Sequence, residues 1–259
     1  MAKRTALVTG ASAGIGKELC TLFAKDGHDL VLVARSEERL RELSAELAAA
    51  HGITAHVVAA DLGAPSAPRA VFAAVEGLGV TIDFLVNNAG FGSNGDFLDL
   101  DLDREAEMIE VNVSALVKLT HLFARGMRER RAGHVLNIAS TAAFQPGPYM
   151  ATYFATKAFV LSFSEALGHE LEGTGVKVTC HCPGATATNF AGTAGNDKTK
   201  LFTSGSVAGA AEVAYDAYRA MHAGDLLAIH GAFNWVQMES LRIAPRALVR
   251  KIVADKNRT

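Results

Sequence analysis

The chain has 259 residues, 49% of them hydrophobic, so it can bury a sizeable core. Its net charge of −2 gives no reason to expect nucleic acid or an anionic membrane as a partner. The three cysteines are too few for a disulfide framework, and Cys180 and Cys182 lack the spacing of a zinc site, which predicts a reducing, cytoplasmic setting and no metal.

Short apolar runs alternate with long helical stretches from the start of the chain. The predicted strands are at 5–9, 29–34, 55–60, 81–88, 133–140, 175–184 and 226–231. The predicted helices are at 17–27, 36–52, within 62–79, at 103–130 and at 152–175. Near-continuous apolar strands separated by helices indicate a parallel sheet covered on both faces. Right-handed crossovers then predict a doubly wound α/β fold of about seven strands.

The whole chain, 1–259, is predicted to be one domain, because no repeat or linker divides it. The polar, Gly-rich stretch 189–206 interrupts the alternation and is either a disordered loop or a flap over a substrate; long loops in compact domains favour the flap. The core then covers 1–188, and 207–259 forms a variable C-terminal region. The apolar run near the N-terminus is too short for a signal peptide, and no run reaches the ~18 residues of a membrane span.

Tyr153 and Lys157 lie four residues apart in a predicted helix and therefore share one face. A nearby ammonium group stabilises phenolate and lowers the pKa of a phenol, which is normally near ~10. Such a Tyr could exchange a proton with an alcohol or carbonyl oxygen near neutral pH. The pair alone is a weak signal, because both residue types are common on helix surfaces.

A Gly-rich turn, Gly10-Ala11-Ser12-Ala13-Gly14-Ile15-Gly16, follows the first predicted strand and opens the first helix. Glycines let the backbone approach a pyrophosphate, and the N-terminus of the helix supplies free N–H groups and a favourable dipole. The spacing differs from the usual G-x-G-x-x-G fingerprint, but the position at the first β-to-α junction strengthens the signal.

The turn, Asn87-Asn88-Ala89-Gly90, Asn112, Ser140, Tyr153-x-x-x-Lys157 and Pro183-Gly184 occur in that order. Over roughly 5–188 the chain thereby resembles the short-chain dehydrogenase/reductase family, which implies a Rossmann-like domain that binds a nicotinamide dinucleotide. The resemblance implies that Tyr153 is the general acid/base, that Lys157 lowers its pKa and holds the nicotinamide ribose, and that Ser140 binds the substrate oxygen. It also implies that Asn112 kinks the long helix and holds a water linked to Lys157.

The resemblance further implies a cofactor site. Its predicted residues are Gly10, Ser12, Gly14, Ile15, Gly16, Arg35, Asp61, Leu62, Asn88, Ala89, Gly90, Tyr153, Lys157, Pro183, Gly184, Thr186 and Thr188, with Asn87 expected beside them. Asp61 resembles an adenine-contacting acid and Thr188 a carboxamide contact, although the first could be a helix cap and the second a plain loop residue.

The second strand ends with Arg35 and carries no acid there to accept from a ribose 2′-OH. An Arg fork suits a 2′-phosphate, and Ser12 could add a donor. This predicts NADP (NADPH) over NAD, unless Arg35 is a solvated loop residue. Ala13 stands where family members often carry a second basic residue, so the preference need not be strict.

The predicted substrate residues are Ser140, Gln145, Tyr149 and Phe190, with Phe91 and Pro146 as further wall residues. Their mostly apolar character favours an aldehyde, ketone or alcohol. The amphipathic tail from Glu239 could cover the pocket, pair subunits or touch a membrane. The helix at 152–175 is apolar nearly all round, which predicts a homodimer or homotetramer, the alternative being a monomer that buries it under its own C-terminal region.

The sequence therefore predicts an NADP(H)-dependent oxidoreductase that transfers a hydride between nicotinamide and a carbonyl or alcohol, with Tyr153 as general acid/base. The alternative is a non-catalytic NADPH-binding regulatory protein, which would not need an intact Ser, Tyr and Lys set. A sugar-nucleotide epimerase is disfavoured, since the chain is short for the extra substrate domain.

Overall fold

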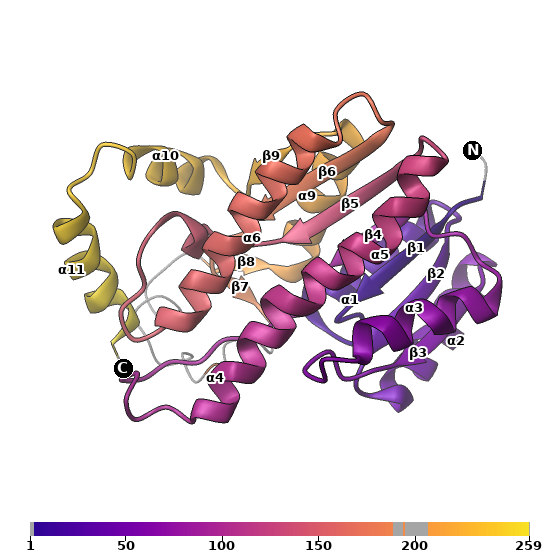
Figure 1. Ribbon diagram of the computed structural model, residues 1–259, viewed down its shortest axis with the longest axis horizontal. Helices are drawn as coiled ribbons and strands as arrows, with labels where there is room; N and C mark the ends of the chain where they lie inside the picture. The colour runs from indigo at the N-terminus through magenta and orange to yellow at the C-terminus, as the bar shows by residue number, and fades with distance from the viewer. Residues whose placement is uncertain (1–2, 189–193, 195–206, 259) are drawn as a thin grey trace.

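A seven-stranded parallel sheet forms the centre of the computed structural model, which describes residues 3–188, 194 and 207–258. The strand order is β3-β2-β1-β4-β5-β6-β9, and every pair is parallel (Figure 1). The strands are β1 (Thr5–Thr9), β2 (Asp29–Ala34), β3 (Ala55–Ala59), β4 (Phe84–Asn87), β5 (Gly133–Ile138), β6 (Val176–Cys182) and β9 (Leu227–Ile229). Two short strands, β7 (Thr186–Ala187) and β8 (Ala208–Gly209), pair with each other. The predicted fold class is confirmed. Apart from Ala194, the predicted flap at 189–206 lies outside the described residues, and so does Phe190.

The helices lie between the strands, as the alternating pattern predicts. They are α1 (Gly14–Lys25), α2 (Glu37–His51), α3 (Ala67–Leu78), α4 (Leu102–Ile109), α5 (Leu116–Glu129), α6 (Ala151–Glu170), α9 (Ala210–Ala223), α10 (Ala232–Ser240) and α11 (Arg246–Asn257). A π-helical turn, η1 (Glu110–Ala115), joins α4 to α5, and a 3₁₀ turn, η2 (Thr141–Phe144), precedes α6. The predicted helix at 103–130 is therefore helical throughout, but its middle is widened into a π turn.

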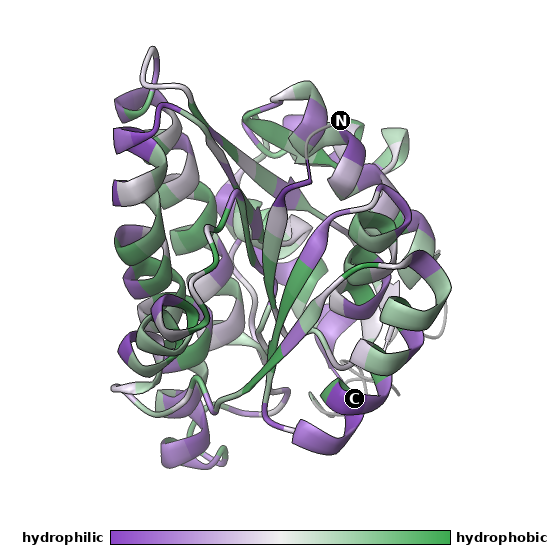
Figure 2. Cartoon of the chain, turned by 90° about the vertical axis from the view of Figure 1, so that its right-hand side faces the viewer, coloured by the Kyte–Doolittle hydropathy of each residue, from purple (hydrophilic) through white to green (hydrophobic). Residues whose placement is uncertain are grey.

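Alternation along the strands gives the sheet two apolar faces. Val8 of β1 packs in one core cluster, with α1, α2 and α9, whereas its neighbour Leu7 packs in a second, with α3 and α5. Figure 2 shows the hydrophobic strands in the middle and helices on both sides. Burial on both faces explains why the strands read as continuous apolar runs.

The C-terminal helices α10 and α11 lie beyond one end of the sheet, in yellow in Figure 1. Val249 and Val253 of α11 pack against Met150 and Phe154 around the start of α6. Asn257 donates to Pro148 O at 3.0 Å, which fixes the end of α11 to the loop before α6. The chain thus returns to cover the end of the sheet at which β5 and β6 finish. Within the described residues, no helix is long and apolar enough to cross a membrane.

Candidate active site

A cavity of about 770 Å³ opens along the carboxyl edge of the sheet. Residues that follow β1 to β6 line it, and residues of α10 and α11 complete the wall. The carboxyl edge of a doubly wound sheet is where such folds bind ligands, because the crossovers diverge there.

The Gly-rich turn forms one end of the cavity. Gly10 has a φ of 66°, and an added Cβ there would lie 2.7 Å from Asn88 Nδ2. Asn88 Nδ2 donates to Thr9 O at 2.9 Å, and Thr9 Oγ1 accepts from the backbone N–H groups of Asn88 and Ala89, both at 3.0 Å. These bonds hold the turn against the end of β4. No side chain caps α1, so its first N–H groups remain available to an anion.

Two predicted cofactor residues of this region have structural positions instead. Gly16 does not line the cavity; it allows helix α1 to lie against Gly10 O. Asn87 is also absent from the cavity wall, because its side chain points into the core and donates to Thr120 Oγ1 at 2.9 Å and to Asn137 Oδ1 at 2.8 Å. The expectation that Asn87 lines the cofactor site is therefore wrong. Ser12, Gly14 and Ile15 do line the cavity.

Arg35 lies at the end of β2, on the cavity wall, with its side chain 65% exposed. Its Nη1 is 3.8 Å from Glu107 Oε1, and Arg104 Nη1 is 2.7 Å from Glu107 Oε2. The contact between Arg35 and Glu107 is thus long, and the closer Arg104 already offsets the charge of the Glu107 carboxylate. The guanidinium group is free to turn toward a phosphate.

Asp61 and Leu62 line the same part of the cavity. Asp61 Oδ1 accepts from Gly63 N at 3.0 Å, which closes a turn directly after β3. Helix α3 begins only at Ala67, so Asp61 is not its cap. The alternative of a helix cap is therefore excluded for Asp61.

Ser140, Tyr153 and Lys157 meet on the opposite part of the cavity wall. Tyr153 and Lys157 share one face of α6, and Lys157 Nζ lies 5.8 Å from the centroid of the Tyr153 ring. Lys157 Nζ donates to Ile138 O at 2.8 Å, two residues before Ser140. Ser140 Oγ accepts from Ala142 N at 3.1 Å, which orients the hydroxyl at the start of η2.

Burial dominates the ionisation of this pair. It raises the pKa of Tyr153 to about 12, against the lowering effect of a hydrogen bond with Ser140. It lowers the pKa of Lys157 to about 8. The direction is opposite to the predicted lowering of the phenol pKa by Lys157, because burial of the phenolate is the largest cause of the shift. At neutral pH the phenol is protonated and can act as a proton donor.

Asn112 lies behind this pair, in the π turn. Its side chain donates to Phe91 O at 2.9 Å and to Thr156 Oγ1 at 3.1 Å, and it accepts from Phe91 N at 3.1 Å. An added Cβ on Gly90 would lie 2.9 Å from Asn112 Oδ1 and 3.6 Å from Lys157 Nζ. Asn112 is buried and holds the backbone beside Lys157 rather than lining the cavity. The water assigned to it by the family resemblance stays a prediction.

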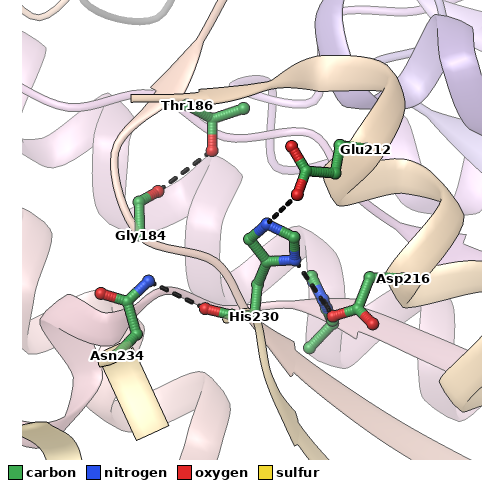
Figure 3. A network of polar contacts seen from close by, with 7 residues as sticks. Gly184, Thr186, Glu212, Asp216, His230 and Asn234 are labelled. Carbon is green, nitrogen blue, oxygen red and sulfur yellow. Dashed lines mark hydrogen bonds and ion pairs between the residues drawn. The ribbon is translucent and has the colours of Figure 1, made fainter. Parts of the chain in front are cut away.

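The turn after β6 closes the cavity near Ser140. Pro183, Gly184, Thr186 and Thr188 all line it. Pro183 O accepts from Thr141 N at 2.9 Å, and Thr186 Oγ1 donates to Gly184 O at 3.0 Å, a bond drawn in Figure 3. These contacts give the turn a fixed shape beside Ser140.

The predicted substrate wall is only partly right. Gln145 and Phe91 line the cavity, but Tyr149 does not. Tyr149 has a φ of 65°, and its hydroxyl accepts from Arg258 Nη2 at 2.7 Å, outside the cavity. The opposite wall comes from residues that the motifs did not reveal: Phe233, Gln237, Met238, Ile252, Val253 and Lys256. Of the three possibilities for the amphipathic tail, the structure shows the one in which it covers the pocket.

A Gly-rich turn at the start of a doubly wound sheet, with a Ser, Tyr and Lys set on the same cavity, marks a nucleotide-binding oxidoreductase. The model of the short chain dehydrogenase family matches residues 4–199, and the chain belongs to this family. A 7beta-hydroxysteroid dehydrogenase of Collinsella aerofaciens is 37% identical over 182 residues, which are 70% of this chain and 68% of the relative.

Two solved structures of the family extend the comparison. A short-chain dehydrogenase from Sphingobium yanoikuyae in complex with NADPH is 35% identical, with a TM-score of 0.83 over 93% of this chain and 94% of that one. A short chain dehydrogenase/reductase from Burkholderia phymatum in complex with NAD is 26% identical, with a TM-score of 0.81 over 92% of each chain. The chain is thus an oxidoreductase of a family in which both dinucleotides occur.

Proposed function

We propose that this protein is an NADP(H)-dependent oxidoreductase that reduces an aldehyde or ketone to an alcohol, or runs the reverse reaction. The observation that carries the proposal is that Ser140, Tyr153 and Lys157 face the same cavity as the Gly-rich turn and Arg35. A proton donor and a dinucleotide cradle on one cavity are what hydride transfer to a carbonyl requires.

The residues present fit a dinucleotide. The uncapped N-terminus of α1 and the close backbone approach at Gly10 suit a pyrophosphate. The end of β2 offers the exposed Arg35 fork, on the same cavity as Ser12, and no acid for a ribose 2′-OH. These features favour a 2′-phosphate, and therefore NADP over NAD. The similar structure from Sphingobium yanoikuyae contains NADPH, and the one from Burkholderia phymatum contains NAD.

The bound nicotinamide supplies the hydride, and the side chains of the chain do the rest. Tyr153, protonated at neutral pH because burial raises its pKa to about 12, gives its proton to the carbonyl oxygen. Ser140 hydrogen-bonds to the same oxygen and stabilises the charge that develops there. Lys157 would hold the cofactor ribose, and its ammonium would offset the negative charge that Tyr153 acquires when it gives up its proton. Asn112 fixes the backbone of Phe91 beside it. The raised phenol pKa favours reduction near neutral pH.

The substrate side of the cavity favours an apolar carbonyl compound. Ala142, Met150, Phe154, Met238 and Val253 provide apolar surface, and Gln145 and Gln237 provide polar groups. The name of the Collinsella relative, a hydroxysteroid dehydrogenase, is consistent with such a substrate. A bulky ketone therefore belongs in the first set of compounds to test.

The non-catalytic alternative is a protein that senses NADPH. It gains no support from the site, since a sensor has no need for an intact Ser, Tyr and Lys set beside the cofactor. We also propose a homodimer or homotetramer paired through α6, where Phe159 is exposed and stacks on Phe163 with ring centroids 5.9 Å apart. A cytoplasmic location remains part of the proposal.

The proposal is tested by fluorescence titration with NADPH and NADH, followed by a screen of aldehydes and ketones. We expect tighter binding of NADPH and oxidation of NADPH that depends on a carbonyl substrate. Tight NADPH binding without hydride transfer to any compound in a broad carbonyl set would favour the sensor. Equal or tighter binding of NADH would overturn the assignment of the cofactor.

A further inference from the structure

Three side chains with metal-binding atoms meet where β6, α9 and β9 come together. His181 is in β6, Asp216 in α9, and His230 follows β9. Asp216 Oδ2 lies 3.2 Å from His181 Nε2 and 3.1 Å from His230 Nδ1. One potential ligand atom from each residue lies within 4.8 Å of the other two. Figure 3 shows Asp216 and Glu212 on α9 facing His230.

The proposed hydride transfer does not use this cluster. Alternation along β6 turns Cys180 and Cys182 toward α6, where Tyr153 lies, and His181 toward α9. His181 is 0% exposed, and its Nδ1 has no hydrogen-bond partner in the described part of the chain. A buried, half-satisfied imidazole costs stability, so its presence calls for a functional explanation.

The cluster can be reached from solvent. Asp216 and His230 are only partly buried, with 36% and 11% of their side chains exposed, which leaves a route from solvent.

We propose that His181 Nε2, His230 Nδ1 and the Asp216 carboxylate form a site for a divalent transition metal, with Zn²⁺ as the best match. Zn²⁺ binds imidazole and carboxylate at ~2.0–2.2 Å, which separates adjacent ligand atoms of a tetrahedron by roughly 3.3 Å. The two measured separations, 3.1 and 3.2 Å, are already close to that value. Two nitrogens and one oxygen also favour Zn²⁺ over Mg²⁺ or Ca²⁺, which prefer all-oxygen sites.

Glu212 supports the assignment from outside the ligand set. Its Oε1 lies 3.7 Å from His230 Nε2, the ring nitrogen that does not face Asp216. A histidine that binds a metal through one nitrogen commonly directs the other toward a carboxylate, which fixes the tautomer. Glu212 and His230 line the same cavity as Tyr153.

A bound metal would join three elements next to the turn after β6. His230 N donates to Cys182 O at 3.2 Å, directly before Pro183, and Asn234 Nδ2 donates to His230 O at 2.8 Å. Asn234 Nδ2 also lies 2.7 Å from where a Cβ on Gly184 would be. His181 lies two positions before Pro183 in the chain, so the role of the metal would be to hold the turn after β6 in place.

The test is a spectroscopic titration of the metal-stripped full chain with Co²⁺, followed by displacement with Zn²⁺. We expect one Co²⁺ per chain with the visible absorption of a low-symmetry, four-coordinate ion, loss of that spectrum on adding Zn²⁺, and a higher melting temperature with Zn²⁺. Binding should weaken as the pH falls and the imidazoles take up protons.

Asp216→Asn keeps the side-chain shape and removes the charged ligand, so Co²⁺ affinity should fall at least tenfold. Glu212→Gln should weaken it less. His169→Asn is the matched control, because His169 forms an exposed pair with Glu172 at 3.3 Å, and this variant should bind Co²⁺ like the parent.

A chain that shows no saturable Co²⁺ spectrum overturns the proposal, and so does an Asp216→Asn variant that binds Co²⁺ as tightly as the parent while its circular dichroism is unchanged. These readouts need neither NADPH nor a carbonyl substrate. The metal site and the proposed oxidoreductase activity can therefore fail independently.

Discussion

Polar side chains lie at both ends of the parallel strands, which are called here the carboxyl edge and the amino edge of the sheet. The side chains at the two edges have different roles. At the carboxyl edge, Tyr153 and Lys157 face a cavity of about 770 Å³. At the amino edge, the rings of His28, His134 and His222 surround Phe84 with centroids 5.3, 5.4 and 5.6 Å away.

Residue type alone therefore does not mark a functional site in this protein. Parallel strands end where the helix N-termini and the crossover loops diverge, so polar side chains there meet solvent and ligands. Where the strands begin, the same kinds of side chain fill space between the sheet and the helices. Changes at the carboxyl edge should therefore remove activity with little loss of stability, and changes at the amino edge should do the opposite.

The largest effect is expected for Tyr153→Phe. Removing the proton donor should lower kcat by about 10²–10⁴-fold, while the NADPH dissociation constant changes by less than about twofold. Steady-state kinetics and fluorescence titration measure the two effects. Tyr215→Phe, at an exposed tyrosine of α9, is the control. Parent-like turnover in the Tyr153→Phe protein would falsify the assigned role.

Arg35→Ala should have the next largest effect. Losing charge-assisted hydrogen bonds to a 2′-phosphate should lower kcat/KM for NADPH by about 10–100-fold and leave NADH within about twofold. Kinetics with both cofactors measure the ratio. Arg41→Ala, which removes an exposed pair with Glu37 on α2, should change neither value. A parallel loss with both cofactors would show that Arg35 does not read the phosphate.

The amino edge should make stability depend on pH. Desolvation lowers the pKa values of His28, His134 and His222 in the folded protein below the ordinary histidine value of about 6.5, against the opposing charge of Asp26 near His28 and His222. The unfolded chain then binds protons more readily, so the stability is complete above about pH 6.5 and is lost as the pH falls. Each fully titrating histidine contributes a slope of up to about 1.4 kcal/mol per pH unit.

Urea unfolding at pH 7.5 and pH 5 measures this loss, and His28→Gln should reduce it because His28 is buried. His169→Gln, at an exposed histidine, should leave the pH dependence unchanged. Equal unfolding free energies of the parent at both pH values would contradict the assignment of buried neutral histidines.

The smallest effect is expected for Tyr218→Phe. The Tyr218 hydroxyl donates to Asp26 Oδ2 at 2.7 Å and joins α9 to the end of α1. Its loss should cost about 1–2 kcal/mol of stability and lower Tm by a few degrees, without changing kcat. Calorimetry and a turnover assay measure both. A fall in kcat at parent-like stability would contradict the expected difference between changes at the two edges of the sheet.

Sequence alone was sufficient to predict the alternation of strands and helices, the Gly-rich turn at the first junction, and the pairing of Tyr153 with Lys157. These follow from short-range rules: the period of apolar residues, the backbone freedom of glycine, and the i to i+4 spacing on a helix. The likeness of the motifs to a family then supplied the expected roles of Asn112, Ser140 and Gly184.

The sequence does not show which of two adjacent residues in a motif faces the cavity, because this depends on how the chain packs. Asn87 and Asn88 are adjacent, yet one is bonded within the core and the other holds the Gly-rich turn. Burial, not the adjacent ammonium, sets the pKa of Tyr153. His181, Asp216 and His230 are 35 and 14 residues apart and meet only because β6, α9 and β9 pack together. Long-range packing and desolvation leave no local pattern, so these features had to come from the folded chain.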